Sequence, residues 1–259
     1  MNKLFFALLF LFASLKLGAL HHPIFDGGSL EDHKNSTPIS AQILDKLTEE
    51  AMQTLCMFGV YEEETAGWTN LWSPATVEKT RATAFFITSD GHFLINKQII
   101  KPQSDITVFL HQKEMVVTAS LIAEHPTEKI ALFKIDKPSD MTLSYLNIAS
   151  NEEEVGNWIF SLRGCALIYN NTLVALPSIG KIVGHLQDYA ASTIPFGDGN
   201  AGSPVLNVEG KVIGILSGNV NFSNVDSGRS GMSATLPIYH LKSWIEEALR
   251  SSGYVEPLK

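Results

Sequence analysis

A few side chains of this sequence are of the types that carry out hydrolysis, and they are scattered along it. His92 and His125 have imidazole rings suited to general-base chemistry, while Ser203 and Cys165 carry nucleophilic groups. For both histidines an exposed position in a turn is the simpler expectation, and Cys165 is expected to be structural. Phosphate-binding glycine loops, HExxH, CxxC pairs and EF-hand loops are all absent. The sequence therefore predicts no metal site and no cofactor.

The most ordered glycine-rich segment is residues 197–207, which read GDGNAGSPVLN, followed by EGKVIGI at residues 209–215. These segments resemble the nucleophile loop and the next strand of chymotrypsin-fold serine proteases of the HtrA/Deg family. In that family the two segments have the motifs G-N-S-G-G-P-L-x-N and G-x-V-I-G-I. Such a loop aims backbone N–H groups at a carbonyl oxygen. The resemblance assigns this oxyanion loop, in vestigial form, to Gly199, Asn200 and Ala201.

The resemblance continues upstream in the order of the family. Residues 84–100 (AFFITSDGHFLINKQII) are similar to G-F-I-I-S-x-D-G-x-I-L-T-N-x-H-V-V, and residues 125–135 (HPTEKIALFKI) to D-P-x-x-D-L-A-V-L-K-V. Shorter similarities follow at residues 155–164, 178–183 and 233–237. The resemblance thus covers about residues 80–248, and no PDZ module is expected after it.

At the three catalytic positions of the family this sequence has other side chains. The general-base histidine falls on Gln98, the orienting aspartate on Lys129 and the nucleophilic serine on Ala201. Ala201 has no oxygen to attack a carbonyl, and the neutral amide of Gln98 cannot take and return a proton. Lys129 has the wrong charge to stabilise an imidazolium. The sequence therefore predicts that the chain is not an enzyme but an exported pseudoprotease, which binds polypeptide or a partner protein.

Binding to an extended peptide needs only the main-chain groups of a strand edge. The resemblance places this edge at Ile215, Leu216 and Ser217, and a closed edge is the alternative. Two other functions stay open. One is an unconventional periplasmic hydrolase with its nucleophile elsewhere, and the other is a structural or regulatory subunit of an active HtrA-like protease. The resemblance also implies a homotrimer or a hetero-oligomer.

The rest of the sequence predicts the fold that holds such a site. Short apolar runs separated by turns recur from about residue 84 to residue 236, which indicates an all-β sandwich or barrel. The resemblance specifies two antiparallel β-barrels of the chymotrypsin-like fold, expected at residues 50–147 and 148–259. The second includes a C-terminal helix, predicted from an apolar stripe before Gly253 that consists of Ile238, Leu241, Ile245, Ala248 and Leu249.

The N-terminus has the pattern of a secretory signal peptide. Residues 1–19 combine an early lysine, the almost unbroken apolar run of residues 4–15 and small residues at the end. This run is too short to span a bilayer, and no later stretch is longer, so no membrane span is expected after cleavage. We therefore expect the chain to be exported to the periplasm or secreted beyond it. Residues 20–49 form a polar lead-in and the start of a helix, which helical spacing predicts over residues 38–58.

Composition excludes several classes of function. The formal net charge is −8, and removing Lys3 and Lys16 with the leader leaves 17 basic against 27 acidic residues, or −10. Nucleic-acid binding is not expected of so acidic a chain. Two cysteines, Cys56 and Cys165, are too few for a disulfide framework or a cysteine-rich zinc module. One disulfide between them and two separate thiols both stay open.

Overall fold

The computed structural model describes residues 40–59, 81–97, 105–110, 115–138, 141–169, 172–197, 199–220 and 231–258. All of them belong to one unit, Pro38–Lys259. The expected signal peptide at residues 1–19 and the lead-in up to residue 39 lie outside the described residues, and so does Gln98.

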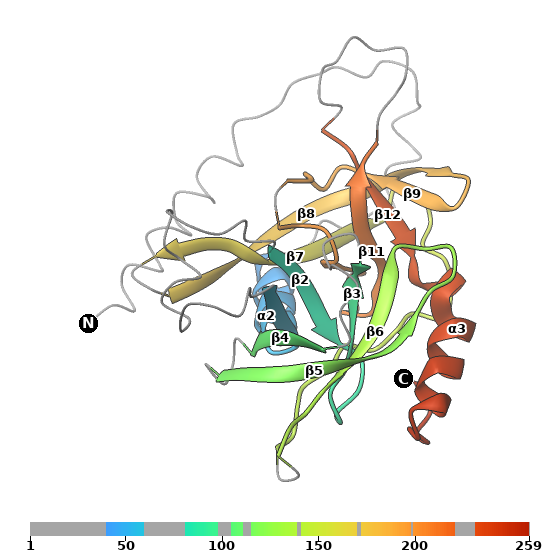
Figure 1. Ribbon diagram of the computed structural model, residues 1–259. Helices are drawn as coiled ribbons and strands as arrows, with labels where there is room; N and C mark the ends of the chain where they lie inside the picture. The colour runs from blue at the N-terminus through green and yellow to red at the C-terminus, as the bar shows by residue number, and fades with distance from the viewer. Residues whose placement is uncertain are drawn as a thin grey trace, which may run out of the picture. The chain divides into compact units, whose positions relative to one another are not determined.

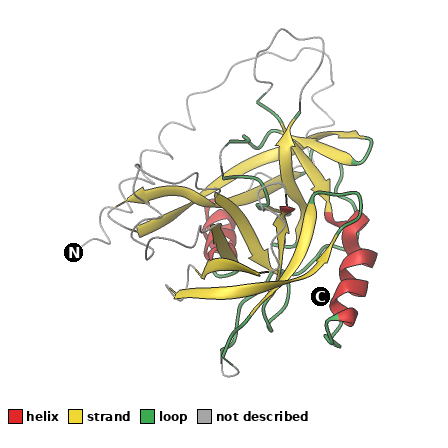
Figure 2. Cartoon of the chain, viewed as in Figure 1, coloured by secondary structure: helices red, strands yellow, loops and turns green. Residues whose placement is uncertain are grey.

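The described strands close into two six-stranded barrels (Figures 1 and 2). The first contains β1 (Leu55–Gly59), β2 (Arg81–Phe86), β3 (His92–Asn96), β4 (Asp105–Leu110), β5 (Met115–Glu124) and β6 (Ile130–Ile135). The second contains β7 (Trp158–Tyr169), β8 (Thr172–Leu186), β9 (Tyr189–Ser192), β10 (Pro204–Leu206), β11 (Val212–Asn219) and β12 (Ser233–Pro237). The strand orders are β1-β2-β3-β6-β5-β4 and β10-β11-β12-β9-β8-β7, and the strand pairings are antiparallel. This architecture confirms the predicted all-β fold of two antiparallel barrels.

A hydrophobic core shared by the two barrels explains why the apolar runs of the sequence are nearly continuous. In β3, Phe93 and Ile95 belong to the interior of the first barrel, whereas Leu94 points into a cluster that also contains Phe160 and Ile215 of the second. Successive residues of a strand face opposite sides. Both faces of β3 are therefore buried, and the strand has no polar face to alternate with.

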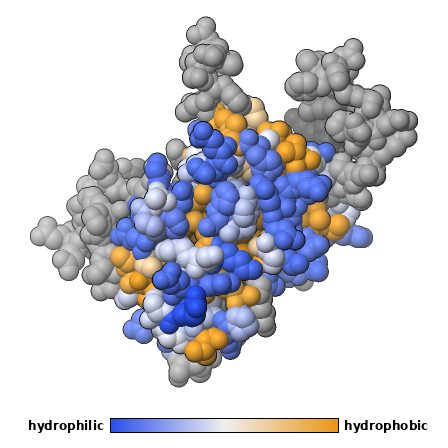
Figure 3. Space-filling view, turned by 90° about the vertical axis from the view of Figure 1, so that its right-hand side faces the viewer, coloured by the Kyte–Doolittle hydropathy of each residue, from blue (hydrophilic) through white to orange (hydrophobic). Residues whose placement is uncertain are grey.

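Helix α3 (Ile238–Ser251) is the last helix of the described residues, and it confirms the predicted apolar stripe. All five stripe residues are buried in the shared core, and Gly253 follows the helix with φ +86°. In Figure 1 the helix runs beside the first barrel. The face of the molecule that carries it is mostly hydrophilic (Figure 3), as expected for an amphipathic surface helix. No described helix is long and apolar enough to cross a membrane.

The N-terminal helix is shorter than predicted. Helix α2 spans Ala41–Met52, with the hydroxyl of Ser40 accepting a hydrogen bond from the Ile43 N–H. Beyond it, Thr54 closes the last turn with a hydrogen bond to the carbonyl oxygen of Ala51. The prediction of helix up to residue 58 is wrong because Leu55–Gly59 pairs with both β2 and β4 and thereby closes the first barrel. Tertiary pairing overrides local spacing here.

Candidate functional site

Two segments of the first barrel meet at the end of β3. The main-chain N–H of Lys97 donates a hydrogen bond of 2.8 Å to the carbonyl oxygen of Lys129, so the loop before β6 is fixed beside the residue that follows β3. The side chain of Lys129 is exposed. Gln98 is the next residue after Lys97 and lies outside the described residues. The backbone therefore places Lys129, one of the three predicted catalytic positions, beside Lys97.

The third position, Ala201, lies in a turn of the second barrel, residues 199–203, that packs directly on the first barrel. A Cβ atom on Gly202 would overlap the carbonyl oxygen of Thr83 in β2 and would lie 3.3 Å from the main-chain nitrogen of Asn96 in β3. Gly202 also has φ +87°, a conformation that favours glycine. The hydroxyl of Thr83 donates a 2.9 Å hydrogen bond to the carbonyl oxygen of Gly199. This contact holds the 199–203 turn against the end of β3.

Main-chain hydrogen bonds within the turn leave two N–H groups without an acceptor among the described residues. The N–H groups of Asn200, Gly202 and Ser203 donate to the carbonyl oxygens of residues 197, 216 and 200. Those of Gly199 and Ala201 donate to no described residue. Gly199 and Ala201 are half-buried, whereas the other residues of the turn are buried. Two free N–H groups with this spacing can stabilise a developing oxyanion or bind a carbonyl oxygen. The oxyanion role of this loop stays a prediction.

The predicted peptide-binding edge is only partly available, because neighbouring strands occupy most of it. Ile215 pairs with Pro204 of β10 and with Leu236 of β12. Leu216 exchanges main-chain hydrogen bonds with the 199–203 turn. On the edge of β11 that faces β10, pairing among the described residues ends at Leu216. On the opposite edge, a register shift between β11 and β12 skips Ser217. The main-chain edge that is left consists of residues 217–219, which we call the 217–219 edge.

Ser203 is not placed to act as a nucleophile at the turn. Its side chain is fully buried, and both its N–H and its carbonyl oxygen are hydrogen bonded within the protein. Its hydroxyl has no hydrogen-bond partner among the described residues. A buried hydroxyl without contact to solvent cannot attack a polypeptide. The side chains of Cys56 and Cys165 lie outside the description, so a disulfide and two thiols both stay open.

The expectation that His92 is an exposed turn residue is wrong, since the structure buries it completely. Its Nδ1 lies 2.8 Å from Oδ1 of Asp90, and its Nε2 lies 2.9 Å from the hydroxyl oxygen of Ser252, 160 residues away. Lys134 also donates a 2.8 Å hydrogen bond to Asp90. Burial opposes ionisation of Asp90, but hydrogen bonds from Lys134, Thr88 and His92 outweigh it and lower its pKa to about 2.

This order of carboxylate, imidazole and hydroxyl is that of a Ser-His-Asp triad. No motif in the sequence predicts it, because Ser252 is 160 residues from His92. Its surroundings lack a place for an oxyanion, because the N–H groups of Ser252, Gly253 and Tyr254 all donate to carbonyl oxygens of α3. The carbonyl oxygen of Leu249 also competes for the Ser252 hydroxyl hydrogen at 2.7 Å. We therefore interpret the network as a lock that fastens the end of α3 to the first barrel.

His125 is likewise not an exposed turn residue, since it is half-buried against the middle of the same helix. Its ring packs edge-on against Trp244 of α3, with centroids 5.1 Å apart. Its Nδ1 accepts a 2.9 Å hydrogen bond from the N–H of Glu128. Burial lowers the pKa of His125. The Glu128 carboxylate in turn accepts a hydrogen bond from the hydroxyl of Tyr189 in the second barrel. The loop that carries Lys129 is thus held by α3 and by the second barrel.

Comparisons with known proteins agree with this fold. The trypsin-like peptidase domain family matches residues 82–215. A protein of Chlamydia pneumoniae named "Probable periplasmic serine endoprotease DegP-like" is 25% identical over 182 residues, which are 68% of this chain and 36% of the relative. Its namesake in Rhizobium meliloti is 24% identical over 177 residues, 66% of this chain and 34% of the relative. The chain thus spans about a third of the length of these curated relatives.

A solved structure shows the same fold. The crystal structure of the serine endoprotease from Yersinia pestis superposes with a TM-score of 0.61 at 18% sequence identity. The similarity covers 84% of this chain and 69% of that one.

These comparisons contradict the expectation that the chain is not an enzyme. The relatives are named serine endoproteases, and the neighbouring structure is that of a serine endoprotease. The expectation rested on three positions assigned by motif similarity, and the side chain of one of them, Gln98, lies outside the described residues.

The packing of Gly202 gives a first prediction. Gly202→Ala places a Cβ against backbone atoms that cannot move aside and forces alanine to a positive φ. We expect the free energy of unfolding to fall by at least about 2 kcal/mol, measured by urea denaturation. Gly218→Ala is the control, because no described atom lies within 4 Å of its added Cβ, and we expect a change within about 0.5 kcal/mol. Equal losses in the two variants would contradict the packing.

The buried His92 gives a second prediction, on acid stability. Burial lowers the pKa of His92 in the folded chain, against the opposing effect of Asp90. As the pH falls below about 6.5, the unfolded chain therefore takes up this proton first, and the folded chain loses stability. His92→Gln should cost about 1–3 kcal/mol at pH 7 through lost buried hydrogen bonds.

The gap in unfolding free energy between wild type and His92→Gln should narrow from pH 7 to pH 5, because the variant lacks the titrating group. Urea denaturation at both pH values measures it. His240→Gln, at an exposed position of α3, is the control for the substitution itself and should change the free energy of unfolding at pH 7 by no more than about 0.5 kcal/mol. A gap of the same size at both pH values would show that His92 does not titrate differently on folding.

Proposed function

Because the chain belongs to the trypsin-like peptidase domain family, with HtrA/Deg-like serine proteases as its relatives, we propose that it binds extended polypeptide where its two barrels meet. The observation that carries this proposal is the pair of N–H groups of Gly199 and Ala201, which no described residue accepts. The 199–203 turn that presents them is held in place by the close contact of Gly202 with β2 and β3. Carbonyl oxygens of a polypeptide match these donors.

The 217–219 edge supplies the second contact. A strand edge recognises extended polypeptide through N–H and C=O groups, whatever the side chains of the ligand are. Ser217 and Gly218 are half-buried and Asn219 is exposed. A Cβ on Gly218 would meet no described atom within 4 Å, which supports room for a ligand beside it. Leu216, the last fully paired residue, links this edge to the 199–203 turn through two hydrogen bonds.

In this proposal Gln98, Lys129 and Ala201 occupy the positions of the base, the orienting carboxylate and the nucleophile of the family. Alanine has no oxygen that can form an acyl intermediate. A hydrolytic step by this chain therefore uses a nucleophile at another position, as in the unconventional hydrolase. Polypeptide binding through main-chain groups does not depend on these three side chains.

The proposal extends to the compartment and the assembly. The relatives are named periplasmic, and residues 1–19 have the pattern of a signal peptide, which supports export of this chain to the periplasm. A homotrimer, or association with an active relative, also belongs to the proposal. Helix α2 buries Leu47 and Ala51 in the core of its own chain, so assembly would use other faces of this helix.

Binding is tested with unfolded, fluorescently labelled casein and the purified chain, by fluorescence anisotropy. Gly218→Trp fills the space beside the 217–219 edge and should weaken binding by at least about tenfold. Gly184→Trp is the matched control, because its Cβ in β8 also meets no described atom within 4 Å, and it should bind like wild type. Binding that is insensitive to Gly218→Trp, or absent in wild type, would contradict the proposal.

The assignment of the three positions is tested by restoring the family residues together, with Gln98→His, Lys129→Asp and Ala201→Ser. We expect the rate of casein cleavage to rise by at least about 100-fold over wild type, with casein binding retained. The matched control restores only two residues and keeps Ala201. Cleavage by wild type at the rate of the triple variant would show that these are not the positions that limit catalysis.

A further inference from the structure

The turn between β5 and β6, residues 125–130, is built around the ring of His125, and we call it the His125 turn. The N–H of His125 donates a 2.9 Å hydrogen bond to the carbonyl oxygen of Ile130, which closes the turn. Within it, Nδ1 of the ring accepts a 2.9 Å hydrogen bond from the N–H of Glu128 and a longer one, of 3.4 Å, from that of Thr127. The ring therefore holds the turn from inside, as the side chains of asparagine and aspartate do in Asx turns.

These hydrogen bonds determine which form of the ring the turn accepts. A backbone N–H can only donate, so Nδ1 must present its lone pair, and the neutral ring carries its hydrogen on Nε2. A second proton can then be added only at Nδ1, where it would face the N–H of Glu128. Both nitrogens of an imidazolium are donors, so no rotation of the ring restores an acceptor. Protonation of His125 therefore removes the hydrogen bonds inside the turn.

The surroundings of His125 keep the ring neutral at pH 7. Burial lowers its pKa, the Glu128 carboxylate raises it and the Lys97 ammonium lowers it. The ring is therefore neutral at pH 7 and takes up its proton in weakly acidic solution. The other charged or titratable groups of the adjoining elements are Glu124 of β5, which pairs with Lys97, Lys129 of the turn, Tyr189 of β9, and His240 and Glu247 of α3, one helical turn from Trp244.

The His125 turn connects three parts of the molecule. The His125 ring packs edge-on against Trp244 of α3. The Glu128 carboxylate accepts a 3.1 Å hydrogen bond from the hydroxyl of Tyr189, which belongs to the other barrel. The carbonyl oxygen of Lys129 accepts the N–H of Lys97 at the end of β3, the strand end on which the 199–203 turn packs. A change in the His125 turn is therefore passed to the edge of the candidate site.

We propose that the His125 turn is a pH-sensitive element, which is ordered while the ring of His125 is neutral and leaves Trp244 and Tyr189 when the ring takes up a proton. Its release loosens the segment that carries Lys129 beside the candidate site, and the affinity for polypeptide changes with pH as a result. Only this last effect rests on the proposed binding of extended polypeptide. The change in the turn itself does not depend on it.

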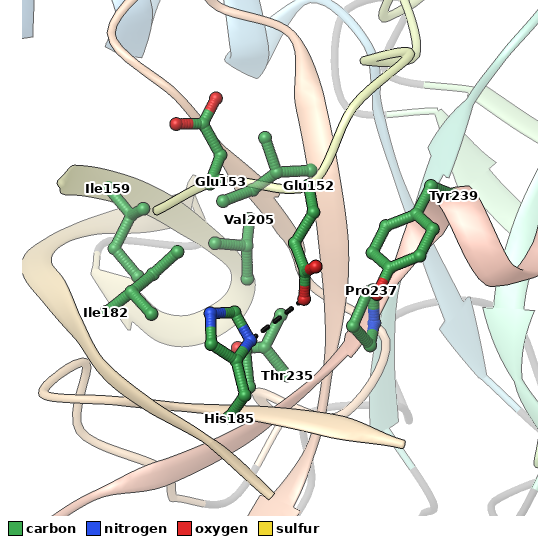
Figure 4. A pocket seen from close by; sticks show the side chains of 11 residues that line it. Glu152, Glu153, Ile159, Ile182, His185, Val205, Thr235, Pro237 and Tyr239 are labelled. Carbon is green, nitrogen blue, oxygen red and sulfur yellow. Dashed lines mark ion pairs between the residues drawn. The ribbon is translucent and has the colours of Figure 1, made fainter. Parts of the chain in front are cut away.

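His185 of the second barrel has the opposite arrangement and provides the control. Its Nδ1 lies 2.9 Å from the carboxylate of Glu152, in the pair that the dashed line marks in Figure 4. A carboxylate accepts, so Nδ1 of His185 donates, and a proton added to this ring leaves the contact in place. Removal of His185 should therefore not affect the response of the His125 turn.

Amide hydrogen exchange at pH 7 and pH 5, corrected for the intrinsic exchange rate at each pH, tests the proposal. Protection of residues 125–130 in wild type should fall by at least about fivefold at pH 5, because the turn loses its internal hydrogen bonds. His125→Asn keeps an oxygen that accepts the N–H groups but does not titrate, so its turn should be equally protected at both pH values. His185→Asn should respond like wild type. His92 is present in all three chains, so its own titration cancels in the comparison.

Equal protection of the wild-type turn at both pH values, or the same loss in His125→Asn, would overturn the proposal. The emission of Trp244, measured as the difference between wild type and Trp244→Phe, gives a second readout. It should change between pH 7 and pH 5, but not when both chains also carry His125→Asn. An unchanged emission with His125 present would show that the ring stays on Trp244 and would likewise overturn the proposal.

The link to polypeptide binding is tested with labelled casein at the same two pH values. The ratio of the two dissociation constants should differ between wild type and His125→Asn by at least about fivefold. An equal ratio would overturn the effect on binding, whereas the exchange experiment decides on the turn itself. Absence of casein binding at pH 7 would instead contradict the proposed function.

Discussion

The contact between Gly202 and the end of the first barrel is the constraint on which the site depends. The turn of the second barrel approaches the carbonyl oxygen of Thr83 so closely that no side chain fits between them. This contact, together with the hydrogen bond from Thr83 to Gly199, fixes the direction of the N–H groups in the turn. The same turn exchanges hydrogen bonds with Leu216 and so sets where the 217–219 edge begins. Without the contact, neither donor pair nor edge would have a defined position.

Main-chain geometry and side-chain chemistry are separable at this site. The packing that positions the turn uses a glycine, a threonine and backbone atoms, none of which takes part in a catalytic triad. A chain that has Gln98, Lys129 and Ala201 at the positions of the family's triad can therefore still keep the backbone proposed to bind a polypeptide. The chain belongs to the trypsin-like peptidase domain family, and the curated relatives that it matches are named serine endoproteases.

The spacing of apolar residues in the sequence predicts those helices and strands whose formation depends on neighbouring residues. Most strands of the two barrels follow from short apolar runs and the surface of α3 from its apolar stripe, but β1 and β9 (Tyr189–Ser192) do not. Other features depend on partners far apart in the sequence. His92 looked like a turn residue because Ser252, its partner at 2.9 Å, is 160 residues away. The end of α2 was misplaced because Leu55–Gly59 is made a strand by its pairing with β2 and β4.

Amide hydrogen exchange, followed by mass spectrometry with and without unfolded casein, tests the central claim most directly. If extended polypeptide binds where the barrels meet, protection should rise at Gly199 and Ala201 and within the 217–219 edge, where the N–H groups that point away from β12 gain acceptors. The amides of α3 should exchange as before. Casein binding that leaves the 199–203 turn and the 217–219 edge unprotected, with protection elsewhere, would contradict the account.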